Sequence, residues 1–285
     1  MSLKRIALSA VLCSIAPWIT SAQSGSPKMY NTVKTKLKEG KHVVGGTVSS
    51  PDPDVYCAMA NSGFDFTWIE MQHSSLGYQD VARMIRACKG ASAIPFIRVP
   101  DATEGDIQKA VDIGALGIVI PMVESVEKVR NGVKFAKYPP MGKRSQGGGQ
   151  YGAMWGGDYR QTANDNIMVV AMIESPAGVD IVQQIADIPG VDVIFVASTD
   201  LGSFSGYKQG DPQYEALATR VHDVTLKAGL KLAGPLAWKG RHGYTFFQGP
   251  GETALIRSGA QAALGTGQGP QPRRSGIAPI EGSEK

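Results

Sequence analysis

The sequence predicts an α/β protein of the TIM (β/α)₈-barrel class, and three observations lead to this prediction. Short apolar runs recur along the chain, and segments with helical spacing lie between them. The runs are continuous rather than alternating, as expected for parallel strands that are covered on both faces. No G-x-G-x-x-G follows the first run, so an open nucleotide-binding sheet, the structural alternative, has little support. We expect strands at 42–48, 66–71, 93–99, 117–123, 167–174, 191–198, 230–237 and 261–266, and helices at 53–62, 78–89, 104–114, 125–136, 176–187, 211–229 and 251–259.

Helix-like segments alternate regularly with the expected strands, with two exceptions. Residues 78–89 are typical of the helices, because their apolar side chains from Val81 to Cys88 fall on one stripe. The connection 138–166 is unusually long, and its Gly-rich part indicates a flexible lid that contributes to specificity. From Gly267 the chain is rich in Gly and Pro and has no helical period, so we expect the eighth helix to be missing or replaced by this tail.

The beginning of the chain has the pattern of a secretory signal. Lys4 and Arg5 precede an apolar stretch, and small residues up to Ala22 suit cleavage there. A membrane anchor is the alternative, but Pro17 interrupts a stretch that is already short for a spanning helix. We therefore expect export. The expected organisation is a signal peptide at 1–22, a lead-in at 23–40, a barrel domain at 41–267 and a flexible tail at 268–285.

Composition is ordinary for one large globular domain, with 42% hydrophobic and 19% charged residues among 285. Removing residues 1–22 lowers the formal net charge from +4 to +2, and no basic stripe with interleaved aromatic residues remains. A nucleic-acid partner is therefore not expected, nor is a membrane once the signal is removed. Cys57 and Cys88 could pair outside the cytoplasm, but we expect two unpaired, half-buried thiols.

Charged side chains recur at the carboxyl ends of the expected strands, where barrel enzymes build their sites. Glu174 ends the fifth strand and Asp200 follows the sixth; Arg98 ends the third, and Glu70 and His73 close the second. The alternatives are that each acid caps the helix that follows, and that Arg98 forms a salt bridge with Glu70 or Glu174.

Two carboxylates on neighbouring strands suit a hard divalent cation such as Mg²⁺ or Mn²⁺. A lysine Schiff base is the other route to carbon–carbon chemistry, but no expected strand ends in lysine, and Lys231 stands at the wrong end of its strand. His73 is a candidate base, oriented by Asp112 if that residue reaches the same rim; a loop histidine and a solvated helix end are the alternatives.

The sequence resembles the HpcH/HpaI aldolases, the metal-dependent pyruvate aldolases, from about residue 40 to 267. The resemblance rests on SGFDFTWIEMQHS, IPFIRVP, QKAVDIGALGIVIPMVES, KYPPMGKRS, MIESPAGVDIVQQIADIPGVDVIFVASTDL and GAQAALGTG. It implies that Glu174 and Asp200 bind Mg²⁺, Mn²⁺ or Co²⁺, that pyruvate chelates the metal, and that Arg98 contacts the keto oxygen. It further implies that His73 and Asp112 act as acid and base through a water molecule. The implied site residues are His73, Arg98 and Asp112 for catalysis, Arg98, Gln72, Ser198, Thr199 and Asp200 for substrate, and Glu174 and Asp200 for the metal.

Three positions depart from the family pattern. Gln72 stands where many members carry an acid, and Ala197-Ser198-Thr199 replaces a Gly-Pro turn whose backbone N–H groups bind the pyruvate carboxylate. The C-terminal helix that members pack against a neighbouring subunit is expected to be absent. The resemblance otherwise implies a homo-oligomer, a hexamer.

We therefore expect an exported, metal-dependent aldolase that cleaves or forms 4-hydroxy-2-oxo acids, releasing an aldehyde and pyruvate enolate. A CoA-thioester lyase of the same superfamily is the second hypothesis. The third is an exported protein that binds a 2-oxo acid but has lost turnover.

Overall fold

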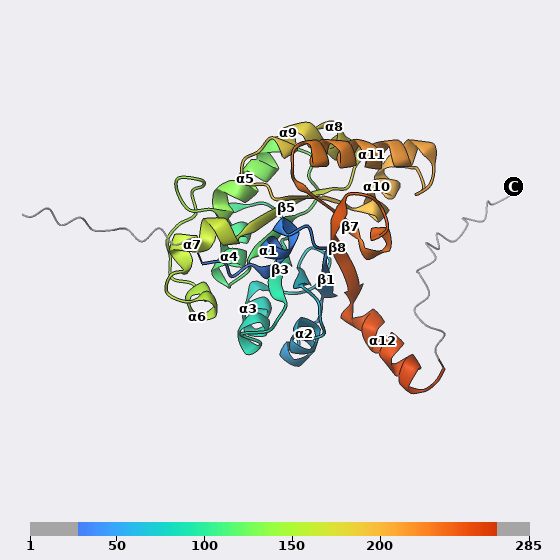
Figure 1. Ribbon diagram of the computed structural model, residues 1–285. Helices are drawn as coiled ribbons and strands as arrows, with labels where there is room; N and C mark the ends of the chain where they lie inside the picture. Colours follow the sequence, from blue (N-terminus) through green and yellow to red (C-terminus); the bar gives the residue numbers. More distant parts are fainter. Residues whose placement is uncertain (1–27, 267–285) are drawn as a thin grey trace, which may run out of the picture.

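Eight parallel strands close into a barrel, as the sequence predicts (Figure 1). The computed structural model describes residues 28–266, so the expected signal segment and the tail lie outside the described residues. Each strand pairs with the next, and the last pairs with the first. The strands are β1 Val43–Val48, β2 Phe66–Glu70, β3 Ile94–Arg98, β4 Gly117–Ile120, β5 Met168–Ile173, β6 Val193–Val196, β7 Lys231–Pro235 and β8 Tyr244–Gly251.

Most helices connect the strands and cover the barrel from outside, while α1 precedes the first strand and α12 follows the last and leads away from the barrel (Figure 1). Within residues 28–266, none of them combines the length and apolar character needed to cross a bilayer. The helices are α1 Thr32–Lys38, α2 Pro53–Ala60, α3 Tyr78–Ala87, α4 Glu104–Asp112, α5 Val126–Ala136, α6 Tyr151–Trp155, α7 Tyr159–Asn166, α8 Pro176–Asp180, α9 Val182–Ala186, α10 Ser198–Ser205, α11 Pro212–Lys227, the 3₁₀ helix η1 Leu236–Trp238, and α12 Glu252–Ala263.

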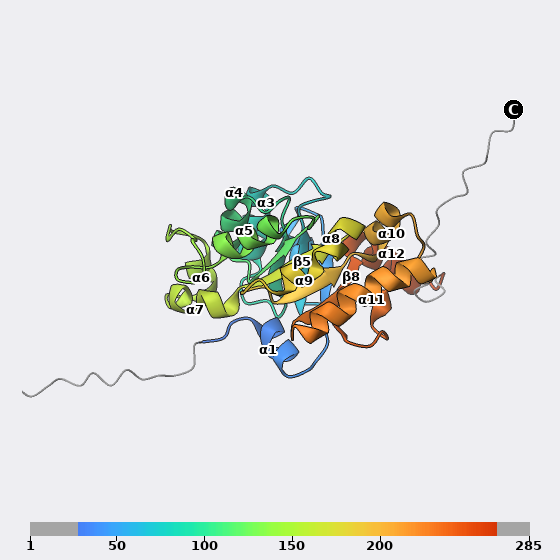
Figure 2. The same ribbon diagram turned by 90° about the horizontal axis from the view of Figure 1, so that it is seen from above.

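Helix α1, blue in Figure 2, lies against the end of the barrel where the strands begin. Asn31, its N-cap, donates from Nδ2 to the carbonyls of Leu116 (3.1 Å) and Asn166 (2.7 Å), just before β4 and β5. Lys34 lies 2.9 Å from Asp192, which precedes β6. The expected lead-in therefore contributes to the barrel, and the opposite end, where the strands terminate, is the one left for a site.

The barrel interior is filled by aromatic rings opposite glycines. Phe66, Phe96 and Phe246 lie with ring centroids 4.4–5.7 Å apart. A Cβ at Gly45 would lie 2.1 Å from the Phe66 ring, and one at Gly117 would lie 1.9 Å from the Phe96 ring. Rings from some strands thus occupy the space that these two glycines leave, which gives a packed core.

The last β/α unit differs from the sequence prediction. The eighth strand is Tyr244–Gly251, and residues 261–266 belong to the end of α12 and the turn after it. The eighth helix is therefore present as Glu252–Ala263, and the missing helix is the seventh, replaced by Leu236–Trp238. The alanine-rich run continues a helix because alanine favours helix, while the Gly-Pro-Gly ending of β8 has the composition of a turn.

The prediction that residues 138–166 contain a lid contributing to specificity is also wrong. The segment 138–166 joins the end of α5 to the start of β5, and barrel helices run back toward the strand starts. It therefore lies at the N-terminal end of the strands, away from the catalytic face, and contains two short helices, α6 and α7.

The two cysteines are paired rather than free. Cys57 of α2 and Cys88, the C-cap of α3, form a disulfide with a Cα–Cα distance of 5.3 Å. Helices α2 and α3 are neighbours on the barrel wall, so the two residues fall within the separation that a disulfide requires. The expectation of unpaired thiols is thus corrected.

Candidate active site

The site is built where β2, β3, β5 and β6 end. Glu70 and Arg98 are the last residues of β2 and β3 and lie directly opposite each other in the strand register. Glu174 follows β5, and Asp200 lies in the first turn of α10, directly after β6. The structure thus brings together the acids and the arginine that the sequence places at strand ends.

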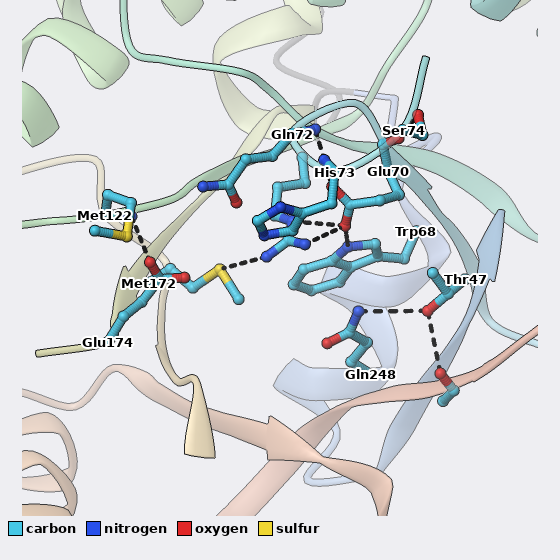
Figure 3. A network of polar contacts seen from close by, with 12 residues as sticks. Thr47, Trp68, Glu70, Gln72, His73, Ser74, Met122, Met172, Glu174 and Gln248 are labelled. Carbon is cyan, nitrogen blue, oxygen red and sulfur yellow. Dashed lines mark hydrogen bonds and ion pairs between the residues drawn. The ribbon is translucent and has the colours of Figure 1, made fainter. Parts of the chain in front are cut away.

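Glu70 is the centre of the polar network (Figure 3). Its Oε2 accepts a hydrogen bond from Arg98 Nε at 2.6 Å, lies 2.5 Å from Arg98 Nη2, and accepts from Trp68 Nε1 at 3.3 Å. Its Oε1 accepts from the backbone N–H groups of Gln72 (2.9 Å) and His73 (3.0 Å). One buried carboxylate therefore fixes both the guanidinium and the loop that carries His73.

Arg98 keeps donors available after this pairing. Its side chain is buried, and the guanidinium lies over the Trp68 ring with Cζ 5.9 Å from the centroid. Nη1 contacts only the weak acceptor Met172 Sδ, at 3.7 Å, within the described residues. The salt bridge with Glu70, one of the alternatives for Arg98, is confirmed, and it leaves Nη1 for an anionic or carbonyl oxygen.

Glu174 is a buried carboxylate with one oxygen lacking a partner. Its Oε2 accepts from the N–H of Met122 at 3.0 Å, while Oε1 is buried with no hydrogen-bond partner among the described residues. Burial raises the pKa of Glu174 to about 7, and the nearby charge of Asp200 adds to this increase. Met122 has a φ of +50°, an uncommon conformation for a residue other than glycine, and strain of this kind is concentrated at functional sites.

The geometry fits a divalent cation better than helix capping. The helix after Glu174 is capped by Ser175, whose Oγ accepts from Gly178 N. Asp200 lies within the first turn of α10 and does not cap it, because the N-cap is Ala197 and no side-chain cap hydrogen bond is present. An unpartnered carboxylate oxygen beside a second carboxylate is a donor set that a hard cation prefers. No group of three or more His, Cys, Asp and Glu side chains suited to a metal occurs in residues 28–266, so a cation held by Glu174 and Asp200 would take its remaining ligands from substrate or water.

The remaining predicted site residues, one catalytic and three substrate-binding, differ in exposure. His73 is exposed, and Gln72 presents a buried Oε1 with no partner among the described residues. Figure 3 shows the Gln72 amide on the side of Met122 and Glu174. In the turn that replaces Gly-Pro, Ser198 is buried and Thr199 is exposed.

Asp112 does not join the site within this chain, which corrects its predicted pairing with His73. It is the last residue of α4, and that helix ends at the N-terminal end of the strands. There Asp112 Oδ1 lies 2.7 Å from Arg144 Nη2. Arg144 is buried, and its Nη1 donates to Tyr159 Oη at 3.0 Å. Asp112 therefore lies at the opposite end of the barrel from His73 and does not reach the same rim.

Two contributions were missed by sequence reasoning. Glu70 was considered only as closing a strand or pairing with Arg98, and its hold on the backbone of Gln72 and His73 was missed. The alternation of Trp68 and Glu70 toward one face indicates that both point into the barrel. The backbone N–H of Met122, which binds Glu174, has no side-chain signature in the sequence.

The fold and this rim define a (β/α)₈-barrel protein with a catalytic-type polar cluster at the carboxyl ends of its strands. The sequence pattern of the HpcH/HpaI aldolase/citrate lyase family matches residues 48–232, and the chain belongs to that family. The family is one of lyases, and the chain is an enzyme of the aldolase type, as the named relatives are.

Several relatives are similar along most of the chain. The hydroxypyruvate/pyruvate aldolase of Roseovarius nubinhibens is 30% identical over 214 residues, 74% of this chain and 82% of the relative. The 2-keto-3-deoxy-L-rhamnonate aldolase of Escherichia coli K12 is 30% identical over 213 residues, 73% and 79% of the two chains.

Solved structures of similar proteins share this fold. A HpcH/HpaI aldolase/citrate lyase family protein from Burkholderia cenocepacia has a TM-score of 0.75 and 28% identity, and covers 82% of this chain and 98% of its own. The citrate synthase SbnG has a TM-score of 0.71 and 31% identity, and covers 82% and 96%.

Proposed function

We propose that this enzyme is a divalent-metal-dependent aldolase that cleaves or forms 4-hydroxy-2-oxo acids by way of a pyruvate enolate. One observation carries the proposal: the unpartnered Oε1 of buried Glu174, beside Asp200, faces a rim where Arg98 keeps a free donor. Pyruvate aldolases among the relatives support the choice of substrate class.

Glu174 and Asp200 would hold the cation, with Mg²⁺, Mn²⁺ and Co²⁺ as the candidates. When bound, it supplies Lewis-acid polarisation of the 2-oxo group. Arg98 Nη1 donates to the keto oxygen and stabilises the negative charge that develops there as the C3–C4 bond breaks, while Glu70 keeps the guanidinium in place.

The residues around this centre position substrate and move the proton. Gln72 Oε1 accepts from a substrate or water donor, and the turn at Ser198 and Thr199 presents backbone N–H groups to the carboxylate. His73, whose backbone is fixed by Glu70, takes the proton of the C4 hydroxyl through a water molecule. Asp112 has no part in this step within one chain.

Exchange of the pyruvate methyl protons in heavy water tests the proposal, because it reports enolisation without any aldehyde. We expect exchange with Mn²⁺ or Mg²⁺, and its loss in Glu174→Gln. The matched control is Glu124→Gln, which changes an exposed acid of the same face whose Oε1 lies 2.7 Å from Ser175 Oγ. Absence of exchange with every divalent ion, or equal rates in Glu174→Gln and wild type, contradicts the proposal.

A second candidate is carbon–carbon chemistry on a CoA thioester, as in the superfamily's lyases. The similarity to a structure described as a citrate synthase favours it. It predicts turnover of acyl-CoA and oxo-acid pairs without pyruvate methyl exchange. Tight pyruvate or oxalate binding with neither reaction would instead identify a 2-oxo-acid-binding protein.

We also propose that the protein is exported, as its signal-like beginning predicts. The Cys57–Cys88 disulfide supports this, because such bonds persist in oxidising compartments. Cell fractionation with alkylation of free thiols checks it: exported protein should be shortened at its N-terminus and resistant to alkylation. Full-length, alkylated protein in the cytoplasm contradicts it.

Self-association is the remaining proposal. Helix α12 leads away from the barrel (Figure 1), and its Leu255 and Ile256, with Leu264 just beyond it, are exposed by 36%, 63% and 75%. Such apolar surface favours burial against another copy. Light scattering should give an oligomer that Ile256→Glu dissociates; a wild-type monomer contradicts the proposal.

A further inference from the structure

The turn that presents Asp200 has no side-chain cap of its own. Strand β6 ends at Val196, and α10 begins at Ser198 after Ala197, an N-cap residue whose side chain cannot accept a hydrogen bond. Alanine is a poor N-cap, so the first turn of this short helix is weakly held by its own sequence. The position of Asp200 must therefore depend on contacts from elsewhere in the fold.

Tyr214 of α11 supplies such a contact. Its hydroxyl donates a hydrogen bond of 2.9 Å to the carbonyl of Ser198, two residues before Asp200. The side chain is fully buried, and its ring packs on the α10 backbone, since a Cβ at Gly202 would lie 3.7 Å from ring atom Cε2. Burial raises the pKa of Tyr214, so the hydroxyl remains a donor across the working pH range.

The Tyr214 ring is in turn packed against Trp238, which has polar and cation contacts of its own. Trp238 of η1 meets Tyr214 edge-on, with centroids 6.5 Å apart and ring planes at 84°. Trp238 Nε1 donates to Gln209 Oε1 at 3.1 Å, in the loop between α10 and α11. Arg241 lies 4.0 Å from the Trp238 ring centroid and donates to both carboxylate oxygens of Glu215, at 2.8 and 3.1 Å. These contacts thus join α11, η1 with the residues that follow it, and the loop between α10 and α11 around Tyr214.

We infer that Tyr214 is a positioning residue for the metal site, which holds the Ser198 carbonyl and thereby fixes the turn that carries Asp200. The inference rests on the proposed role of Asp200 as a metal ligand. Replacing residues that hydrogen-bond to metal ligands typically costs about 10–100-fold in affinity. Because Tyr214 acts through the backbone two residues before Asp200, we expect an effect at the low end of that range.

Tyr214→Phe tests the inference, with Tyr244→Phe as the matched control. Tyr244 packs on the same Trp238 ring, with centroids 5.3 Å apart, so its replacement also removes a hydroxyl from the aromatic cluster but leaves the Ser198 contact intact. Two quantities are measured in the full protein: the dissociation constant for Mn²⁺ by titration calorimetry, and amide hydrogen exchange in residues 197–206 without metal. The Leu201 amide, bonded to the Ala197 carbonyl at 2.9 Å, spans the turn and reports its opening.

We expect Tyr214→Phe to raise the Mn²⁺ dissociation constant about tenfold and to speed exchange in residues 197–206, with Tyr244→Phe within twofold of wild type in both. Equal effects of the two variants would mean general packing and overturn the inference. So would unchanged exchange, or faster exchange with unchanged Mn²⁺ affinity. If wild type binds no Mn²⁺, the metal role proposed for Asp200 fails and the inference with it, while the exchange data show separately whether Tyr214 holds the turn.

Discussion

The pH dependence of stability gives a direct test of how Glu174 is buried. Its pKa is about 7 in the folded protein, against 4.5 for an unperturbed glutamate. Between these values the native state keeps a proton that the unfolded chain has released, so the free energy of unfolding falls as pH rises. The slope is up to about 1.4 kcal/mol per pH unit, and the whole window is worth about 3 kcal/mol.

Glu174→Gln removes this titration while preserving the shape of the side chain. The amide carbonyl can still accept from Met122, and any cost of burying the NH₂ group is the same at every pH. Urea unfolding of wild type and variant at pH 5 and pH 8, both in chelator, gives a double difference that isolates the Glu174 proton. We expect wild type to lose about 2.5 kcal/mol more than the variant between the two pH values, because pH 5 lies inside the titration window.

A double difference near zero would refute the reasoning, because it would mean that Glu174 is solvated or that other interactions offset the effect of burial on its pKa. Mn²⁺ affinity provides a second check on the same group. A metal requires the deprotonated carboxylate, so affinity should fall about tenfold per pH unit below pH 7 and level off above it.

Three further outcomes follow from the contacts. Arg98→Lys should slow pyruvate methyl exchange by about 10²–10³-fold, because lysine cannot hold a two-point contact with a carboxylate and also donate to substrate; rates within threefold contradict this. Asp112→Ala should lower the free energy of unfolding by about 3 kcal/mol in urea, because it leaves the buried Arg144 cation without its carboxylate; a loss below about 1 kcal/mol would show that the pair is not needed. Cys57→Ser should lower it by about 3–4 kcal/mol for a bond to Cys88 that spans 31 residues; equal urea midpoints for oxidised wild type and variant would count against this.

Most of the barrel could be predicted from sequence because buried parallel strands have one recognisable composition. The first seven strands are continuous apolar runs, and Glu174 and Asp200 are visible as charges directly after two of them. The eighth strand was missed because Gly249, Pro250 and Gly251 have the composition of a turn, while the alanines of α12 form a similar short apolar run.

The remaining errors concern position along the barrel axis, which a local pattern does not encode. Asp112 and the segment 138–166 were placed at the catalytic face, although both come where a helix has already returned to the strand starts. Apart from the Arg98 pairing, which was one of the alternatives, the network around Glu70 was missed for a related reason. It depends on which atoms of β2 and β3 come into contact, and that follows from strand register rather than from residue type.

The phenylalanine and glycine packing inside the barrel has a consequence for which molecules this enzyme accepts. Phenylalanine rings fill the barrel interior beneath Trp68, so the barrel has no internal channel that could hold part of a long substrate. On the proposed function, the oxo-acid part of the substrate would bind at the charged groups, and the rest of the molecule would lie across the outer surface. Recognition of the aldehyde part would then fall to the loops around the opening, which can change in evolution without disturbing the packed barrel interior.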